Sequence, residues 1–419
     1  MSHYQPYPAY KESGVEWLGR VPENWDIRAV KTLARLDGGS GFPEDEQGQS
    51  EHSIPFFKVA ELVSNLQTTD NTVSEATAKR LGAKIFQPNT LVFAKVGAAL
   101  LLNRRCLLEV AACLDNNMLA LSPTSCSPRW LFWVFSIIDM GLIANPGAVP
   151  SINQEQVGNI RLCVPSLDEQ LHIVARLDRE TARLDALVEK KTRFIELLHE
   201  KRQALITHAV TKGLDPNVKM KDSGVEWLGE VPEHWLVTTV SRLFEIKAGG
   251  DLKEDFFSDV QDEVHCYPIY TNSVKLDAVY GYTSKAFYLP NTISVSGRGE
   301  IGHAVYRENA YDAIIRLLVL TPKSRKHCKY SAYFINAVLD FHGGSTAVSQ
   351  LSAEQIAPYL MLNPSDKEQI EISIYLDNET SRIDTLINKT ERSIGLLKER
   401  RSALITAAVT GQLDLQEAI

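Results

Sequence analysis

A short motif occurs twice in the chain, about half a chain length apart, and this repeat constrains the fold more than any other feature. Residues 13–19 and 223–229 both read SGVEWLG. The match continues as VPENW at 21–25 and as VPEHW at 231–235. Repetition at a fixed period is the mark of a chain built from repeated structural units. The chain is therefore predicted to fold as two related halves.

A longer pair of segments, residues 177–215 and 376–414, aligns without a gap and is identical at more than half of its positions. Apolar residues recur in both at steps of three, four and seven, which is typical of an amphipathic helix with coiled-coil character. Ser166 and Ser365, each preceded by a proline, are the predicted N-caps. Such a narrow apolar stripe is not stable alone in water, so we expect the two helices to pair with each other, antiparallel, with a dimerisation coil as the alternative.

The alternation of variable and repeated segments predicts the domain organisation. Residues 1–165 and 216–364 are predicted to form two domains, and residues 166–215 and 365–419 two long helices. The predicted elements of the variable domains are strands at Leu91–Ala94, Thr292–Val295 and Leu317–Thr321 and helices at Trp130–Met140 and Tyr330–Phe341. The predicted fold class is α+β: two mixed α/β domains joined by two long antiparallel coiled-coil helices, with a pseudo-twofold internal repeat.

Composition is that of a globular protein, with 44% hydrophobic and 23% charged residues. No apolar run is long enough to cross a membrane, and the N-terminus does not resemble a signal peptide, so we expect a cytoplasmic protein. The six cysteines form no CxxC pair and are interpreted as core thiols. The net charge of −8 is not the basic signature that nucleic-acid binding usually gives. Cations are instead concentrated locally, at residues 79–105 and 323–329.

Motifs for catalysis or cofactor binding are not convincing. Residues 297–302 fit GxGxxG, but a strand is predicted after them, so we interpret them as a tight loop with Arg298 at its tip. Glu245 and Lys247 are interpreted as surface charges rather than as part of a nuclease site. The sequence contains no GxxxxGK[ST] motif, no methyltransferase motif of the Asn/Asp-Pro-Pro-aromatic type and no metal-spaced histidine cluster. We therefore predict no catalytic residue and no metal site in this chain.

The openings SGVEWLG–VPExW and the segments PSLDEQ–LD–ET–RxDxLI–LLxExRxALITxAVTxxLD resemble those of type I restriction–modification specificity subunits. The resemblance is specific in the repeated segments and weak in the variable ones. It implies two target recognition domains that each read one half of a split double-stranded DNA site. It also implies helices that dock two methyltransferase (modification) subunits, which ATP-dependent nuclease (restriction) subunits join. The chain would then be a non-catalytic subunit of a restriction enzyme and site-specific adenine methyltransferase, and S-adenosylmethionine, ATP and Mg²⁺ would belong to its partners.

Candidate DNA contacts are polar and basic residues of predicted loops, because Arg suits guanine and Asn suits adenine. In the first domain they are Lys95, Arg104, Arg105, Asn116, Asn117, Ser151 and Asn153. In the second domain they are Thr271, Asn272, Ser273, Arg298, His303, Arg307, Ser345 and Thr346. For each residue, an ordinary surface or turn role is an equally good interpretation.

Candidate partner contacts are charged helix residues that are identical in both copies and are predicted to face solvent: Arg183, Asp185, Arg202, Arg382, Asp384 and Arg401. Two identical faces could bind two copies of one partner, although a recent duplication would also explain the identity. Two other functional classes stay open at this point. The chain could be a coiled-coil adaptor without a DNA role, or a stand-alone DNA-modifying enzyme.

Overall fold

The computed structural model describes residues 6–272, 279–315, 317–324, 327–341 and 350–415. The chain forms two compact units: Met1–Lys190 with Ser393–Ile419 is unit 1, and Lys191–Arg392 is unit 2. Each long helix is therefore divided between the units, whereas the sequence predicted helices separate from the domains. Among the described residues, no helix is long and apolar enough to span a membrane.

The two predicted long helices are confirmed as α6, Leu167–Lys212, and α10, Asp366–Val409. Both predicted N-caps are confirmed too. The Ser166 hydroxyl accepts a hydrogen bond from the backbone N–H of Glu169 at 3.3 Å, and the Ser365 hydroxyl accepts one from that of Glu368 at 3.3 Å. Such caps satisfy backbone donors that the first helical turn leaves unpaired. The sequence therefore predicted the first residue of both long helices to within two positions.

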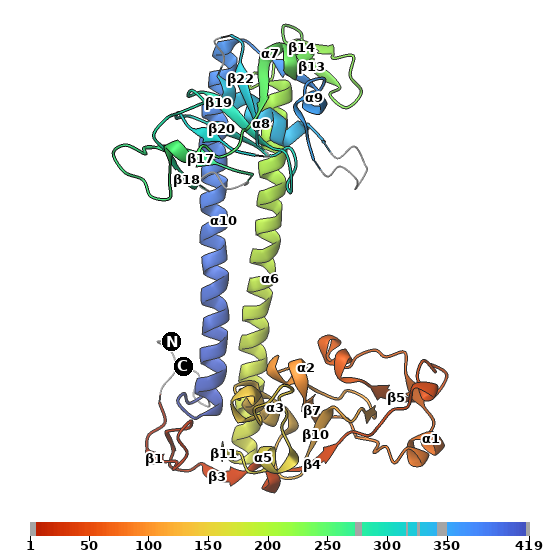
Figure 1. The fold of residues 1–419 in the computed structure, drawn as a ribbon. Coiled ribbons are helices and arrows are strands. Elements are labelled where there is room, and N and C mark those ends of the chain that lie inside the picture. Colours follow the sequence, from red (N-terminus) through yellow and green to blue (C-terminus); the bar gives the residue numbers. More distant parts are fainter. Residues whose placement is uncertain (1–5, 273–278, 316, 325–326, 342–349, 416–419) are drawn as a thin grey trace. The chain divides into compact units, whose positions relative to one another are not determined.

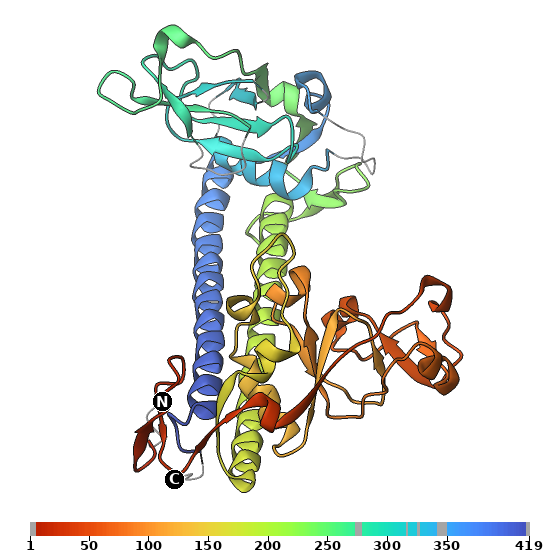
Figure 2. The ribbon, with the colours of Figure 1, turned by 60° about the horizontal axis from the view of Figure 1, so that its bottom comes forward.

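In unit 1, a buried tryptophan of the repeated motif holds the start of α6 to the end of α10. The indole N–H of Trp25 donates to the Glu169 carboxylate at 2.9 Å. A Cβ built on Gly411, just beyond α10, would lie 3.3 Å from the same ring. The helix segments of this unit therefore run antiparallel, and they lie side by side in both views (Figures 1 and 2).

Unit 2 repeats this clamp with the roles of the helices exchanged. The indole N–H of Trp235 donates to the Glu368 carboxylate, in the first turn of α10, at 3.0 Å. A Cβ on Gly213, which follows α6, would lie 3.3 Å from the Trp235 ring. Since Trp25 and Trp235 are both fully buried, the repeated VPExW motif is a structural clamp in each unit.

The strands of unit 1 form a hairpin β1–β2, a pair β3–β11, a sheet of order β4–β10–β7–β8 and a sheet of order β6–β5–β9. Their bounds are β1 Tyr10–Glu12, β2 Arg20–Pro22, β3 Asp26–Ala29, β4 Ala34–Gly38, β5 Ile54–Phe57, β6 Thr72–Val73, β7 Leu91–Ala94, β8 Arg105–Leu107, β9 Cys113–Leu114, β10 Met118–Pro123 and β11 Arg161–Val164. The shorter helices are α1 Glu75–Arg80, α2 Gly97–Leu101, α3 Pro128–Ser136, α4 Met140–Ile143 and α5 Gln154–Gly158.

The strands of unit 2 form a hairpin β12–β13, a pair β14–β23, a sheet of order β15–β22–β19–β20 and a sheet of order β16–β18–β17–β21. Their bounds are β12 Met220–Asp222, β13 Glu230–Pro232, β14 Leu236–Thr239, β15 Phe244–Ala248, β16 Phe257–Ser258, β17 Tyr267–Tyr270, β18 Val279–Thr283, β19 Thr292–Ser296, β20 Ala304–Arg307, β21 Asp312–Ala313, β22 Leu317–Pro322 and β23 Leu360–Asn363. The shorter helices are α7 Val240–Leu243, α8 Cys328–Val338 and α9 Ala353–Ile356.

The sheets β4–β10–β7–β8 and β15–β22–β19–β20 thus share their strand order although the variable sequences differ, whereas the second sheets have three strands in unit 1 and four in unit 2. The predicted strands at 91–94, 292–295 and 317–321 are confirmed as β7, β19 and β22, which lie inside the corresponding sheets. The predicted helix Trp130–Met140 is in fact two helices, α3 and α4, and the predicted helix Tyr330–Phe341 begins and ends earlier, as α8. The predicted α+β class and internal repeat are confirmed.

Each unit has its main core between its sheet, its α3 or α8 helix and its parts of α6 and α10. In unit 1 this core includes Trp25, Trp130 and Phe135, and in unit 2 it includes Trp235 and Phe334, all of them almost fully buried. Burial of such large aromatic side chains is a dominant contribution to stability. The helices are therefore part of each unit's core rather than a separate stalk.

Candidate nucleic-acid interface

In unit 1 the loop that follows β7 meets the loop that precedes α5. The N–H of Ile152 donates to the carbonyl of Lys95 at 2.9 Å, and the N–H of Gly97 donates to the carbonyl of Pro150 at 2.8 Å. In unit 2 the same two loops meet after β19 and before α9, where the N–H of Leu351 donates to the carbonyl of Gly297 at 2.8 Å. The fold therefore builds the same loop junction in both units from different side chains.

The junction of unit 1 surrounds a cavity of about 510 Å³, and Lys95, Ser151 and Asn153 are among its lining residues. Asn117 lies beside them, because its carbonyl accepts a hydrogen bond from the N–H of Lys95 at 2.8 Å. Four candidate residues from three separate parts of the sequence are thus brought together. Asn153 also has a structural task, since its side chain caps α5 through the N–H of Gln156 at 2.8 Å.

The turn that carries Asn116 and Asn117 is fixed by a buried carboxylate. Asp115 accepts from the N–H groups of Val59 at 2.9 Å and Asn117 at 2.8 Å. A Cβ on Gly39 would lie 1.8 Å from the carbonyl oxygen of Asp115, so only glycine allows this close backbone approach. Asn116 is exposed at the tip of the turn.

Arg105 forms a structural network within unit 1. Its guanidinium donates to the Asn103 carbonyl at 2.9 Å, the Asn103 side-chain oxygen at 3.2 Å and the Ile138 carbonyl at 3.1 Å. Burial lowers the pKa of this guanidinium to about 10, which still leaves it cationic at neutral pH. These bonds occupy Arg105 inside the fold, and its contact with DNA stays a prediction, as does that of the half-buried Arg104.

In unit 2, Asn272 organises the loop that carries Arg298. The Asn272 side-chain oxygen accepts from the Ser296 hydroxyl at 3.0 Å and from the N–H of Arg298 at 3.2 Å, and its amide donates to the Arg298 carbonyl. The exposed Arg298 guanidinium bonds Gln350 at 2.9 Å. The prediction that the GxGxxG segment is a tight loop between strands is confirmed, because it joins β19 to β20.

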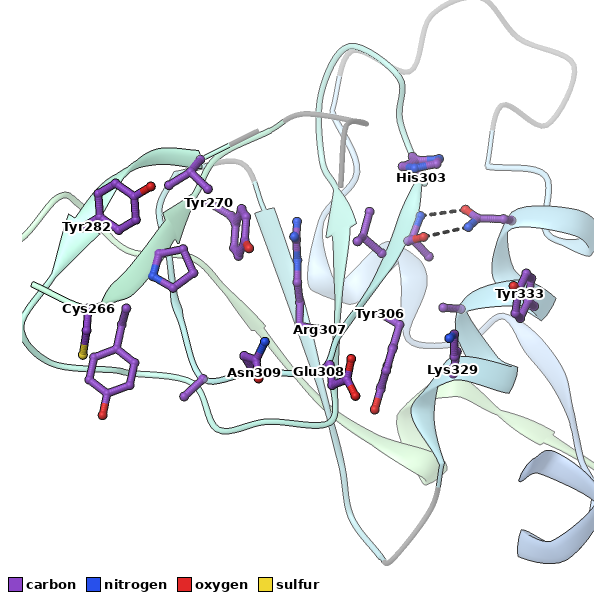
Figure 3. Close-up of a pocket in the computed structure, with 18 of the residues that line it drawn as sticks. Cys266, Tyr270, Tyr282, His303, Tyr306, Arg307, Glu308, Asn309, Lys329 and Tyr333 are labelled. Atoms are coloured by element: carbon purple, nitrogen blue, oxygen red, sulfur yellow. Dashed lines mark hydrogen bonds between the residues drawn. The ribbon is translucent and has the colours of Figure 1, made fainter. Parts of the chain in front are cut away.

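His303 and Arg307 line a larger cavity of unit 2, of about 870 Å³ (Figure 3). Arg307 is almost fully buried, with its guanidinium carbon 3.5 Å from the centre of the Tyr270 ring. Burial lowers the pKa of Arg307. The cavity wall is held by Asn336, whose side chain exchanges two hydrogen bonds of 2.7 Å with the backbone of Ala304 (Figure 3). Arg307 is thus enclosed within the fold, unlike the exposed Arg298, and its contact with DNA stays a prediction.

The remaining candidates in the second domain are not assembled in this way. Thr271 is half-buried next to Asn272. Ser273, Ser345 and Thr346 lie outside the described residues.

The basic stretches seen in the sequence are partly neutralised inside each unit. Arg80 forms an ion pair with Glu46, and Lys84 with Asp37. In unit 2, Lys329 pairs with Asp377 of α10. Local clusters of cations in the sequence therefore overstate the positive surface that is free to bind phosphate. Glu245 and Lys247 form an exposed surface pair at 2.7 Å on β15, in agreement with their interpretation as surface charges.

Four of the six helix residues that are predicted to face a partner also form ion pairs between the two helices. Asp185 and Arg401 form an ion pair at 2.9 Å in unit 1, and Arg202 and Asp384 form one at 3.0 Å in unit 2. These are the same pair of repeat positions, so pairing between the helices explains their identity. Each of these side chains is also partly exposed, so its contact with a partner subunit stays a prediction. Arg183 and Arg382 are exposed.

The prediction that all six cysteines are core thiols is wrong for Cys266. The other five are buried, and Cys266 is exposed at the rim of the larger cavity. It lies in the loop before β17, where no apolar periodicity marks a core position.

Sequence reasoning missed the acidic partners of the clamp tryptophans and a set of exposed apolar helix residues. Leu171, Leu187 and Leu396 are exposed in unit 1, and their repeat equivalents Ile370, Leu386 and Leu197 are exposed in unit 2. Leu187 and Leu386 lie on the apolar stripe that predicts the coiled coil, so only their exposure was missed. Comparison of the two copies for apolar residues off this stripe could have found the other four.

The comparisons with known proteins agree on one family. The model of the type I restriction modification DNA specificity domain matches residues 22–197 and 232–394. A type I specificity subunit of Mycoplasma pneumoniae is 26% identical over 272 residues, which are 64% of this chain and 69% of that protein. Among solved structures, a chain of a type I R-M system, studied for its complex assembly and conformational transition, has a TM-score of 0.72 at 13% identity, with 93% of this chain and 98% of that one covered. The HsdS subunit from Thermoanaerobacter tengcongensis has a TM-score of 0.58 at 14% identity, with 94% and 98% covered. At these identities the structural matches support the fold alone.

Proposed function

The chain belongs to the family of type I restriction modification DNA specificity domains, and from this premise we propose that its loop junctions read the two halves of a split DNA target. It is a specificity subunit with two target recognition domains. Unit 1 reads one half-site through the junction around Lys95, Ser151 and Asn153. Unit 2 reads the other through the loop around Arg298.

One observation carries this proposal. Both units build the same junction, but its side chains differ: Lys95 follows β7 in unit 1, and Gly297 and Arg298 follow β19 in unit 2. Different bases require different side chains on a common frame, because sequence is read by donors, acceptors and apolar groups at base edges. Arg298 is suited to guanine, and the Asn116–Asn117 turn to adenine.

We further propose that the paired helices bind two copies of a methyltransferase subunit, one for each unit. The repeated exposed apolar residues support this, because equivalent surfaces suit equivalent partners. Arg183 and Arg382 lie at equivalent exposed positions and are the remaining charged candidates. Restriction subunits would join that assembly.

In this proposal the chain itself is not catalytic. S-adenosylmethionine, ATP and Mg²⁺ act on the partner subunits, and the complex acts in the cytoplasm, where chromosomal and invading DNA are accessible. The acidic net charge of −8 fits a reader whose partners bind many of the phosphates.

Exchange of one variable region tests the proposal. Residues 20–165 are replaced by the matching region of another specificity subunit, and the methylated sites of the reconstituted complex are mapped by sequencing. We expect one half of the target to change and the other to stay the same. If both halves changed together, the two-reader proposal would be wrong. If the complex assembled but methylated without sequence preference, the chain would be an adaptor. Methyl transfer by the isolated chain would identify an enzyme.

A further inference from the structure

Unit 1 exposes three leucines next to its loop junction. Leu101 lies at the end of α2, Leu102 follows it, and Leu142 lies on α4. Their exposures are 52%, 59% and 84%. The two helices are in contact, since a Cβ on Gly141 would lie 3.2 Å from Cδ2 of Leu101. Exposed apolar side chains on two helices that touch each other form a candidate interaction site. We name Leu101, Leu102 and Leu142 the leucine surface.

The leucine surface is held by a network of hydrogen bonds beneath it. Asn103, in the left-handed region at φ 52°, donates from its amide to Asp139 at 2.8 Å and accepts from the N–H of Met140 at 2.8 Å. Arg105 bonds both Asn103 and the Ile138 carbonyl. The segment after α2 is therefore fastened to the start of α4. The leucines are presented at fixed positions, which is what a specific contact requires.

The leucine surface occupies the place in unit 1 that the Arg298 loop occupies in unit 2. In unit 1, residues 95–104 connect β7 to β8, and in unit 2, residues 297–303 connect β19 to β20. Both hairpins lie at the same edge of equivalent sheets, and both begin at the loop junction. If Arg298 of unit 2 contacts a base in one half-site, residues 95–104 of unit 1 are therefore expected to contact the equivalent base in the other half-site.

Resting on the proposed function, we propose that the leucine surface contacts the C5-methyl groups of thymine in the first half-site. The thymine methyl is the apolar group that base pairs present in the major groove, and it is contacted by apolar side chains. Leucine has no donor or acceptor for any other base edge. Arg104, next in the chain to this surface, is placed to bind the adjoining phosphates. The two half-sites would thus be read by different chemistry, apolar in the first and charged in the second.

Replacement of thymine by uracil tests the contact directly, because deoxyuridine lacks only the C5-methyl group. The target of the reconstituted complex with its methyltransferase subunits is first mapped, and the half-site read by unit 1 is assigned by exchange of residues 20–165. Each thymine of that half-site is then replaced in turn, and DNA affinity is measured at fixed salt. We expect the affinity of the unaltered complex to fall about fourfold at one position or more, the value for loss of one buried methyl group.

The leucine variants complete the test. In Leu102→Ala and Leu142→Ala, thymine and uracil should bind equally at those positions, while the second half-site is unaffected. Val63→Ala is the matched control, because Val63 is also an exposed apolar residue of unit 1 but belongs to the 3-10 helix Val59–Ser64 and not to residues 95–104 or α4. Since the leucines are exposed, these changes leave the core intact.

Three results would overturn the inference. The first is a thymine preference that persists in both leucine variants, and the second is a first half-site without any A·T pair. The third is weaker binding of the methyltransferase subunit, measured by native mass spectrometry, without a change in base preference, since that would identify the leucine surface as a protein contact. Failure of the unaltered complex to bind any specific target would instead contradict the proposed function, and the inference with it.

Discussion

Replacement of Trp235 by phenylalanine should weaken unit 2 at its clamp between α6 and α10. The fully buried indole N–H donates to the Glu368 carboxylate at 3.0 Å. The same carboxylate also accepts from Ser365 at 2.7 Å and lies 2.8 Å from a ring nitrogen of His234. Phenylalanine keeps an apolar ring but removes the donor. The clamp would lose one of its charge-assisted hydrogen bonds.

The pKa of Glu368 gives the size of the effect. Burial raises this pKa, but hydrogen bonds from Trp235, Ser365 and His234 outweigh burial and lower it from 4.5 to about 2. The shift corresponds to roughly 3 kcal/mol in the free energy of unfolding, shared among four donors, because Ser365 donates from both its hydroxyl and its backbone N–H. Loss of one donor then costs roughly 1 kcal/mol, and the smaller ring adds roughly 1 kcal/mol. We expect Trp235→Phe to lower the free energy of unfolding by about 2 kcal/mol at pH 7.

The pH dependence of the variant has a definite sign. Because the pKa of Glu368 is lower in the folded state, its stabilisation is complete above pH 4.5 and is lost as the pH falls toward 2. The hydrogen-bond part of the difference between Trp235→Phe and the unaltered protein should therefore shrink across this window. Urea unfolding followed by circular dichroism gives the total free energy. Hydrogen exchange of the first turns of α10 gives the part that belongs to unit 2.

Trp227→Phe is the matched control, because Trp227 belongs to the same repeated motif but is 52% exposed. Its substitution should change the free energy of unfolding by less than about 0.5 kcal/mol. If the two variants were equally stable, or if the Trp235→Phe difference were constant from pH 7 to pH 2.5, the clamp would not depend on the bond to Glu368.

Three further predictions concern other structural contacts within the two units. Asp384→Arg should lower stability by about 1 kcal/mol, and Arg202→Asp in the same chain should restore it, as measured by a urea double-mutant cycle. Gly39→Ala should cost roughly 3 kcal/mol, because its Cβ would meet the Asp115 carbonyl; native-like thermal stability of this variant would contradict the observed turn. Arg105→Ala should cost about 2 kcal/mol in urea unfolding, because its bonds to Asn103 and Ile138 lie within unit 1; an unchanged free energy of unfolding would contradict this structural role.

The helices were predictable from the sequence because their signal is long and local. Each helix has an apolar stripe over more than 40 positions and a serine cap after a proline. Both features depend on residues that are close together in the sequence. The sequence also contains a Glu-Gln pair in each half, at 155–156 and at 354–355, and its role is local too. Gln156 and Gln355 close capping boxes on Asn153 and Ser352. The shared strand order of the variable regions was not predictable, because it depends on pairing between distant strands of unlike sequence.

The candidate DNA contacts fall into two groups. The surroundings of some come from neighbouring residues in the sequence, and those of others come from distant segments. Arg298 at a loop tip and Asn116 at a turn were chosen from local signals, and both are exposed. Arg105 and Arg307 were chosen for the same residue type, yet each is enclosed by segments remote in sequence, Arg105 by Ile138 and Arg307 by Tyr270. Residue type predicts what a side chain can bind, whereas tertiary packing decides whether it is accessible. Exposed and enclosed arginines cannot be separated without the fold.

Tertiary contacts also explain why the repeated motifs are alike in the two halves while the loops between them differ. Trp25 and Trp235 each touch two helix ends, so a change at either position disturbs the core of its unit. Asp185 with Arg401 and Arg202 with Asp384 must match across two helices, so neither member can change alone without leaving a charge unpaired. Residues 95–104 and 297–303 meet their junctions through backbone hydrogen bonds, and the side chains that hold each loop, Asn103 in unit 1 and Asn272 in unit 2, do not have to match each other. Side-chain contacts that must match across the helices, and loops that are each held by their own contacts, therefore let two recognition loops differ on one repeated fold.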